Sequence, residues 1–145
     1  MPRISVVIAT YRSFPEFQVV VDSLDAQTLD QSEFEVIVVD DGSPDDTIDR
    51  LRAVADVRAN WRVERIDNTG WPGAARNVGI DLATAPYVFF ADHDDPMFPE
   101  ALSAMADFAE DSAADVVHPK ECVRGWQTPG WASWRQQTEL VEALD

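Results

Sequence analysis

The sequence predicts one α/β domain, in which a mostly parallel central sheet is covered on both faces by helices. Short, β-branched apolar runs recur along the chain, and segments with helical spacing of apolar residues separate them. Where strands and helices alternate in this way, consecutive strands run parallel and the connecting helices cover the sheet. A length of 145 residues is that of a single ordinary domain, so residues 1–145 are expected to form one unit.

The first half of the chain alternates buried strands with amphipathic helices. Residues 4–9 form a nearly uninterrupted β-branched run, which is typical of a strand buried on both faces. Helical spacing follows at residues 17–24, and residues 35–39 repeat the pattern of a buried strand. A second helix is expected around residues 48–55, before a more alternating strand at residues 62–66.

The second half continues the alternation. Residues 74–83 predict a helix with small and apolar side chains on one face, and residues 87–91 predict the fourth strand. The next helix is expected around residues 102–109, and a fifth strand at residues 115–118. A last helix is expected at residues 134–144. In such a sheet, ligands bind at the carboxyl ends of the strands.

Composition excludes several classes of partner. The formal net charge of −16 argues against nucleic acid or an anionic membrane, because both would repel the chain. The single cysteine, Cys122, rules out an internal disulfide framework. The apolar run at residues 4–9 is far too short to span a membrane. We therefore expect a cytoplasmic protein, or one held at the inner face of the membrane by another region or a partner.

Acidic residues follow two of the expected strands. Asp40 and Asp41 come directly after the second strand, and Asp92, Asp94 and Asp95 come directly after the fourth. Carboxylates crowded at one edge of a sheet repel one another unless a cation neutralises them. Oxygen ligands favour Mg²⁺ or Mn²⁺ shared with nucleotide phosphates. Either Asp92 and Asp94 converge on one ion, or one of them binds the ion while its neighbour holds a ribose hydroxyl. The alternative is that they serve only as turn and cap residues.

A glycine-containing loop and one arginine suggest an anion site. Residues 68–73 form a flexible turn before the helix that contains Arg76. The exposed amides at the start of a helix, together with a guanidinium, suit a diphosphate. The alternative is a surface ion pair between Arg76 and one of the 27 acidic residues.

Several stretches occur in the order found in one known family: residues 5–11, 27–28, 38–43, 68–79 and 92–95. Through them the chain resembles the donor-binding half of glycosyltransferase family 2, inverting enzymes of the GT-A fold that use nucleotide-diphosphate sugars. Within the family, the run from 68 to 95 and residues 115–117 look most like transferases that glycosylate wall teichoic acid. The position before Thr10, often proline in the family, is Ala9 here, and Arg12 stands where asparagine is frequent.

The resemblance implies a role for each matching polar residue. The implied donor-binding residues are Thr10 and Tyr11 around the base, Asp41 on the imide of uracil, Asn68 on the nucleotide, Arg76 on the diphosphate and Asp92 on the ribose or sugar. The implied ligands of Mn²⁺ or Mg²⁺ are Asp94, Asp92 and Asp95. The donor would be a UDP-sugar, and the acceptor a saccharide such as a cell-wall or surface glycopolymer.

The resemblance assigns no catalytic base to this chain. The general base of the family is an acidic residue further downstream, in the acceptor-binding half. The 145 residues are therefore expected to be either the donor half of a longer protein or a donor-site module completed by another component. A non-catalytic nucleotide-sugar-binding module is the alternative function.

Two other protein classes fit the sequence less well. A receiver-type signalling domain would place its acidic pair after the first strand, where Thr10 and Tyr11 stand, although Lys120 would suit it. A sugar nucleotidyltransferase would need a glycine-rich basic loop at the same place.

The remaining polar and aromatic residues receive structural interpretations. Strand alternation turns His93 away from its acidic neighbours, so we expect it to be structural. In the C-terminal region, the tryptophans form either a platform for a sugar ring or part of a core. Separately, the apolar face of the last expected helix would favour a homo-oligomer. The residues concerned are Trp126, Trp131, Trp134, Leu140 and Leu144.

Overall fold

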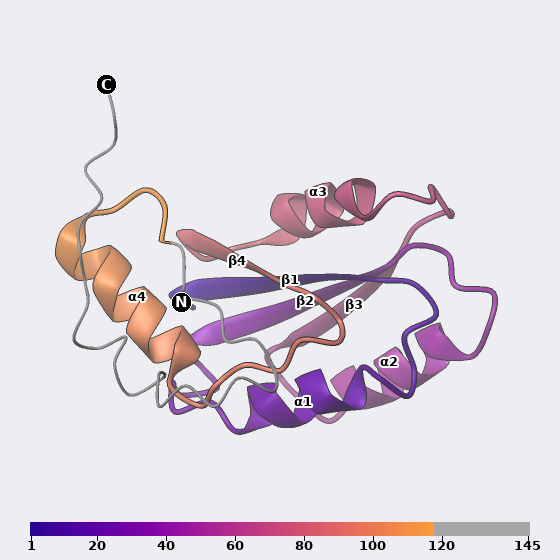
Figure 1. Cartoon of the computed structure of the whole chain (residues 1–145), viewed down its shortest axis with the longest axis horizontal. Coiled ribbons are helices and arrows are strands. Elements are labelled where there is room, and N and C mark those ends of the chain that lie inside the picture. Colours follow the sequence, from indigo (N-terminus) through magenta and orange to yellow (C-terminus); the bar gives the residue numbers. More distant parts are fainter. Residues whose placement is uncertain (118–145) are drawn as a thin grey trace, which may run out of the picture.

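The computed structural model describes residues 1–117, in which four strands and four helices alternate along the chain (Figure 1). The strands are β1 (Ile4–Thr10), β2 (Phe34–Asp40), β3 (Trp61–Arg65) and β4 (Tyr87–Ala91). The helices are α1 (Gln18–Asp25), α2 (Thr47–Ala55), α3 (Pro72–Leu82) and α4 (Ala101–Ser112). The interpretations of Lys120, Cys122, the three C-terminal tryptophans and the last helix lie outside the described residues.

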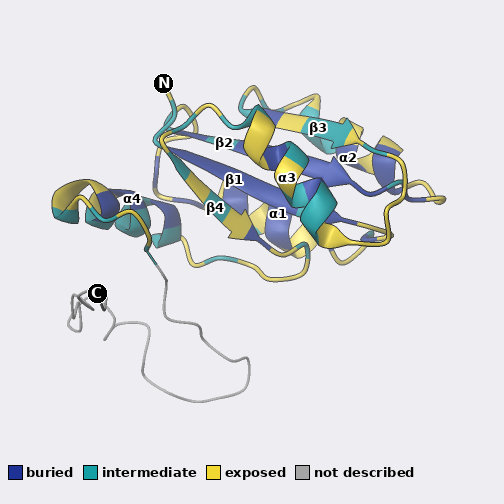
Figure 2. Ribbon diagram, turned by 90° about the horizontal axis from the view of Figure 1, so that it is seen from above, coloured by how far each residue is buried: buried dark blue, intermediate teal, exposed yellow. Residues whose placement is uncertain are grey.

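The four strands form one parallel sheet in the order β3-β2-β1-β4. In its register, Ile8 of β1 lies opposite Val38 of β2 and Ala91 of β4. The strands β1 and β2 are buried on both faces, as their nearly uninterrupted apolar runs predict, whereas β3 and β4 each include exposed positions (Figure 2). Because all four strands are parallel, their carboxyl ends meet at a single edge of the sheet.

Three helices cover one face of the sheet. The helices α1, α2 and α4 lie on this side and α3 lies on the other (Figure 1). Val6 and Ile8 of β1 pack there with Phe17, Leu51 and Leu102, all of them buried. Burying a side chain of this size contributes roughly 1.5–3 kcal/mol, so this layer supplies most of the apolar stabilisation.

The other face of the sheet is covered by α3. Val7 and Ile37 point to this side and pack against Ala75. Gly79 brings the helix very close to the strand, since a Cβ atom there would lie 2.2 Å from Cγ1 of Val7. Gly79 therefore belongs to the packed face of α3, as the helical spacing predicts.

Two expectations for the chain differ from the structure. The helix expected at residues 74–83 begins earlier, at Pro72, which places Arg76 in its second turn. The fifth strand expected at residues 115–118 is absent from its described part, residues 115–117. Val116 is 84% exposed and has no strand beside it among residues 1–117, so this short run gains no burial from an extended conformation. No helix within residues 1–117 has the length and apolar character needed to cross a membrane.

Candidate functional site

A pocket of about 380 Å³ opens at the carboxyl edge of the sheet. Four of the six residues expected to bind a donor line it: Thr10, Tyr11, Asp41 and Asn68. Thr10 ends β1 and Tyr11 follows it, whereas Asp41 and Asn68 follow β2 and β3. The parallel sheet thus brings residues that are distant in sequence to one place. Its other lining residues are Ala9, Gly70, Trp71, Pro72 and His93.

Asp40 at the end of β2 is a structural residue. Its fully buried carboxylate accepts hydrogen bonds from the backbone N–H of Ser43, at 3.0 Å, and from the Ser43 hydroxyl. Arg65 lies beside it, with Nε 3.7 Å from the carboxylate. The Ser43 hydroxyl also accepts the backbone N–H of Arg12 at 2.9 Å, which joins the loop after β1 to the loop after β2. Asp40 therefore fixes the local backbone and is not available to a ligand.

Asp41 supports the loop that forms one wall of the pocket. Asp41 is only 5% exposed. Its carboxylate accepts hydrogen bonds from the N–H and the hydroxyl of Thr69, both at 2.9 Å, and from the N–H of Gly70 at 3.0 Å. The Asn68 amide donates to the Asp41 carbonyl at 2.7 Å. An ionised carboxylate offers about four acceptor positions, and residues 1–117 occupy three of them at Asp41.

Gly42 allows these two loops to approach each other. Its φ of +69° lies in the left-handed region that glycine favours. A Cβ atom at this position would lie 2.6 Å from the backbone nitrogen of Asn68. The glycine of the expected acidic motif is therefore required by both backbone conformation and space.

Arg76 and Asp92, the other two expected donor-binding residues, contact each other beside the pocket. The guanidinium Nη2 lies 2.7 Å from Oδ1 of Asp92, and its carbon lies 6.0 Å from the centre of the Phe90 ring. The Arg76 Nε is buried and has no hydrogen-bond partner among the described residues. The surface ion pair considered for Arg76 is thus present, and its partner is one of the residues expected at the site. Both side chains are partly exposed, which makes the pair weak and exchangeable.

The three expected metal ligands do not form a preassembled cluster. Asp92, Asp94 and Asp95 lie on the exposed turn after β4, where the N–H of Asp95 meets the carbonyl of Asp92 at 3.5 Å. Within residues 1–117, no three acidic, histidine or cysteine side chains gather as a metal site. The Asp92 carboxylate is instead drawn to Arg76, because an ion pair is available there. The side chains of Asp94 and Asp95 make no hydrogen bond or ion pair with the described part of the chain.

Two further side chains that line the pocket, His93 and Trp71, are not among the residues assigned to the donor. His93, interpreted as structural, borders it together with Trp71. Its sequence position could have indicated this location, because His93 comes shortly after β4 and the carboxyl ends of all four strands meet at this edge. Trp71 stands in the loop before α3, where the sequence allows either a role in shaping the donor loop or packing alone.

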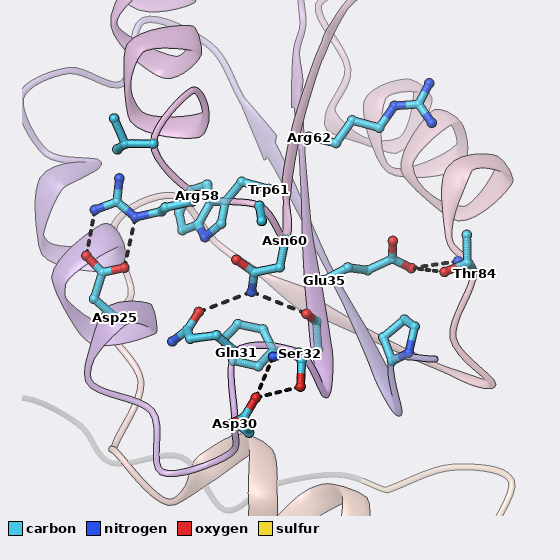
Figure 3. A pocket seen from close by; sticks show the side chains of 14 residues that line it. Asp25, Asp30, Gln31, Ser32, Glu35, Arg58, Asn60, Trp61, Arg62 and Thr84 are labelled. Atoms are coloured by element: carbon cyan, nitrogen blue, oxygen red, sulfur yellow. Dashed lines mark hydrogen bonds and ion pairs between the residues drawn. The ribbon is translucent and has the colours of Figure 1, made fainter.

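A second hollow, of about 910 Å³, lies at the opposite edge of the sheet, near the amino ends of β2 and β3 (Figure 3). Its polar side chains are largely paired with one another rather than directed at a common point. The pairs are Arg58 with Asp25, Asn60 with Gln31, Ser32 with Asp30, and Thr84 with Glu35. This hollow is larger than the first pocket, but its polar side chains mostly hydrogen-bond one another, so few of their donors and acceptors are left to bind a ligand.

Sequence relatives with established names cover most of this chain. It is 37% identical over 116 residues to a poly(ribitol-phosphate) beta-glucosyltransferase of Bacillus spizizenii, covering 79% of this chain and 18% of that protein. It is 35% identical over 118 residues to TarS of Staphylococcus aureus, a poly(ribitol-phosphate) beta-N-acetylglucosaminyltransferase, covering 81% of this chain and 20% of TarS. The chain thus spans about a fifth of the length of these two relatives.

Solved structures show the same fold. The crystal structure of S. aureus TarS 1-349 in complex with UDP-GlcNAc matches with a TM-score of 0.79 and 34% identity, over 89% of this chain and 37% of that one. A mannosyltransferase from Pyrobaculum calidifontis in complex with GDP-Man and Mn²⁺ matches with a TM-score of 0.67 and 25% identity, over 74% of this chain and 32% of that one. The predicted α/β architecture of the GT-A type is therefore confirmed.

The family model described as "Glycosyl transferase family 2" matches residues 5–139. This match excludes the receiver-domain and nucleotidyltransferase interpretations, and it agrees with the order of residues around the pocket. The chain belongs to glycosyl transferase family 2.

Proposed function

We propose that this chain is the donor-binding part of an inverting, metal-dependent glycosyltransferase that moves a sugar from a UDP-sugar to a cell-surface glycopolymer. The observation that carries the proposal is the single pocket in which Thr10, Tyr11, Asp41 and Asn68 meet. The similarity to TarS in complex with UDP-GlcNAc supports the choice of donor. Two relatives named for poly(ribitol-phosphate) support a polymeric acceptor.

The pocket binds the nucleoside in this proposal. Tyr11 flanks the base, and the remaining acceptor position of Asp41 receives the imide N–H of uracil. Adenine presents no imide N–H, so this contact favours a uridine nucleotide. Asn68 holds the nucleotide from the same wall, and its own amide is fixed on the Asp41 carbonyl.

Arg76 and Asp92 serve the diphosphate and the ribose or sugar. Their side chains pair at 2.7 Å, and Arg76 belongs to the second turn of α3. A diphosphate offers Arg76 two negative groups in place of one carboxylate, and the first N–H groups of α3 add further donors. Release of Arg76 would leave Asp92 free to accept a hydroxyl of the ribose or sugar.

The acidic turn fits a divalent cation that is shared with the donor. Its ligands would be carboxylate oxygens, which suit Mg²⁺ or Mn²⁺, and Asp94 and Asp95 have no described partner to give up. A cation of this kind needs only one or two carboxylates when phosphate oxygens complete its shell, so a preassembled cluster is unnecessary. When bound, it would stabilise the negative charge of the leaving diphosphate. We assign Asp94 as the main ligand, helped by Asp95. The general base is assigned to no residue of this chain.

Calorimetric titration with UDP, with and without Mn²⁺, tests the proposal. The wild-type chain should bind UDP more tightly when Mn²⁺ is present, and Asp94→Asn should lose this gain while remaining folded. Asp111→Asn is the matched control, because it removes the same charge from an exposed position on α4. Equal Mn²⁺ dependence in the two variants would contradict the metal assignment. No UDP binding by the wild type would contradict the donor site itself.

A further inference from the structure

Trp71 is an exposed aromatic residue at the rim of the nucleotide pocket. It is 69% exposed, although tryptophan is the largest apolar side chain, and it immediately precedes α3. It lines the same pocket as Tyr11, Asp41 and Asn68. Apolar surface that faces a pocket gains free energy when a ligand covers it.

The backbone of Trp71 is held in place by the carboxylate at the base of the pocket. Thr69 donates its N–H and its hydroxyl to Asp41, and Gly70 donates its N–H to the other oxygen. The Thr69 hydroxyl oxygen in turn accepts the N–H of Trp71 at 3.3 Å. The chain of contacts from Asp41 therefore fixes where the tryptophan leaves the loop.

The indole ring also has a defined position. A Cβ atom on Gly73 would lie 2.5 Å from Nε1 and 2.9 Å from Cδ1 of Trp71, so this edge of the ring rests against the Gly73 backbone. Any larger residue at position 73 would displace the ring. Since one edge is supported and most of the ring is exposed, the indole is a preorganised wall with a free surface.

A second aromatic ring borders the pocket from another element. Tyr11 follows β1 and is 43% exposed, and the Arg12 guanidinium lies 5.5 Å from the centre of its ring. Arg12 therefore lies against one face of the Tyr11 ring. Tyr11 and Trp71 make no ring contact with each other within residues 1–117. Two separate aromatic walls near a buried carboxylate acceptor suit a flat, conjugated ring that carries an N–H.

We infer that the Trp71 indole packs on the base of the bound nucleotide and so determines both affinity and preference at the nucleoside end. This inference rests on the proposed function. Trp71 shares the pocket with the residues proposed for the base, whereas Arg76 and Asp92, proposed for the diphosphate and sugar, do not line it.

Calorimetry with UDP, UMP and inorganic pyrophosphate tests the inference on the full chain in Mn²⁺. Stacking of an aromatic side chain on a base changes affinity by about tenfold. Trp71→Ala should therefore weaken the binding of UDP and the binding of UMP by about the same tenfold factor. Trp71→Phe keeps a flat ring and should lose less. Pyrophosphate binding should be unchanged in both variants.

Tryptophan fluorescence supplies the matched control. UDP should quench the emission of the wild type and of Trp61→Phe, whose indole lies at the opposite edge of the sheet and whose Nε1 has no described partner. Trp71→Phe should bind UDP with little quenching. Unchanged UDP affinity in Trp71→Ala, or an equal loss for pyrophosphate, would overturn this inference alone. Absence of UDP binding by the wild type would overturn the proposed function and the inference together.

Discussion

Replacement of Gly42 by alanine should destabilise the protein more than the same change at Gly70. The two glycines have nearly identical φ values, +69° and +68°, in the region that side chains disfavour. They differ in their surroundings: a Cβ atom on Gly42 would lie 2.6 Å from the Asn68 nitrogen, whereas one on Gly70 would meet nothing within 4 Å. The pair therefore separates backbone strain from steric conflict.

The magnitude follows from these two effects. A left-handed conformation costs an alanine roughly 1–2 kcal/mol, and this applies to both variants. Gly42→Ala adds an overpacking cost of about 1–3 kcal/mol, because the atom it meets belongs to the backbone and cannot rotate away. The reduced entropy of the unfolded chain stabilises both variants equally and cancels in the comparison. We therefore expect Gly42→Ala to be the less stable variant by about 1–3 kcal/mol.

Urea denaturation of both variants measures this difference as the change in the free energy of unfolding. Calorimetry with UDP adds a functional measurement, because movement of Asn68 would disturb the pocket wall that its amide holds on Asp41. Gly42→Ala should weaken UDP binding more than Gly70→Ala. Equal stability of the two variants would show that the loops separate easily, and it would refute the close approach as a requirement of the fold.

Two further predictions concern packing and pH. Gly79→Ala should cost about 1–3 kcal/mol of unfolding free energy in urea denaturation, because its Cβ would overlap the buried Val7; a neutral effect would mean that α3 can shift away freely. Burial raises the pKa of Glu35, but hydrogen bonds from Ser5 and Thr84 together outweigh it and hold the pKa below its ordinary value. The wild type should therefore exceed Glu35→Gln in stability by about 1 kcal/mol above the unfolded-state pKa near 4.3, and lose this advantage as the pH falls through the lower folded-state pKa. A pH-independent difference between the two in denaturation from pH 7 to pH 3 would contradict this assignment.

The strands and the polar residues that follow them could be predicted from the sequence, because each of these signals is local. The run before Thr10 is apolar at every position except Ser5, and this pattern predicts burial on both faces of the sheet. The acidic residues follow their strands directly, and a parallel sheet places all strand ends at one edge. The expectation that Thr10, Asp41 and Asn68 meet is therefore a consequence of topology, and the structure brings them together in one pocket.

The short run at residues 115–117 shows where such local signals fail. Its two valines match a strand pattern, but a strand also needs a neighbour to pair with, and none is present there among the described residues. Local propensity alone could not supply that information.

The sequence by itself determined the fold class, the strand ends that carry polar groups and, through its motifs, the family. Only the tertiary structure decided which partner each polar group takes. Arg76 meets Asp92 across 16 positions of sequence, and Asp41 holds the turn that carries Trp71. Hydrogen bonds and ion pairs form between groups that the packed chain brings within about 3 Å, a condition that periodicity and composition do not encode.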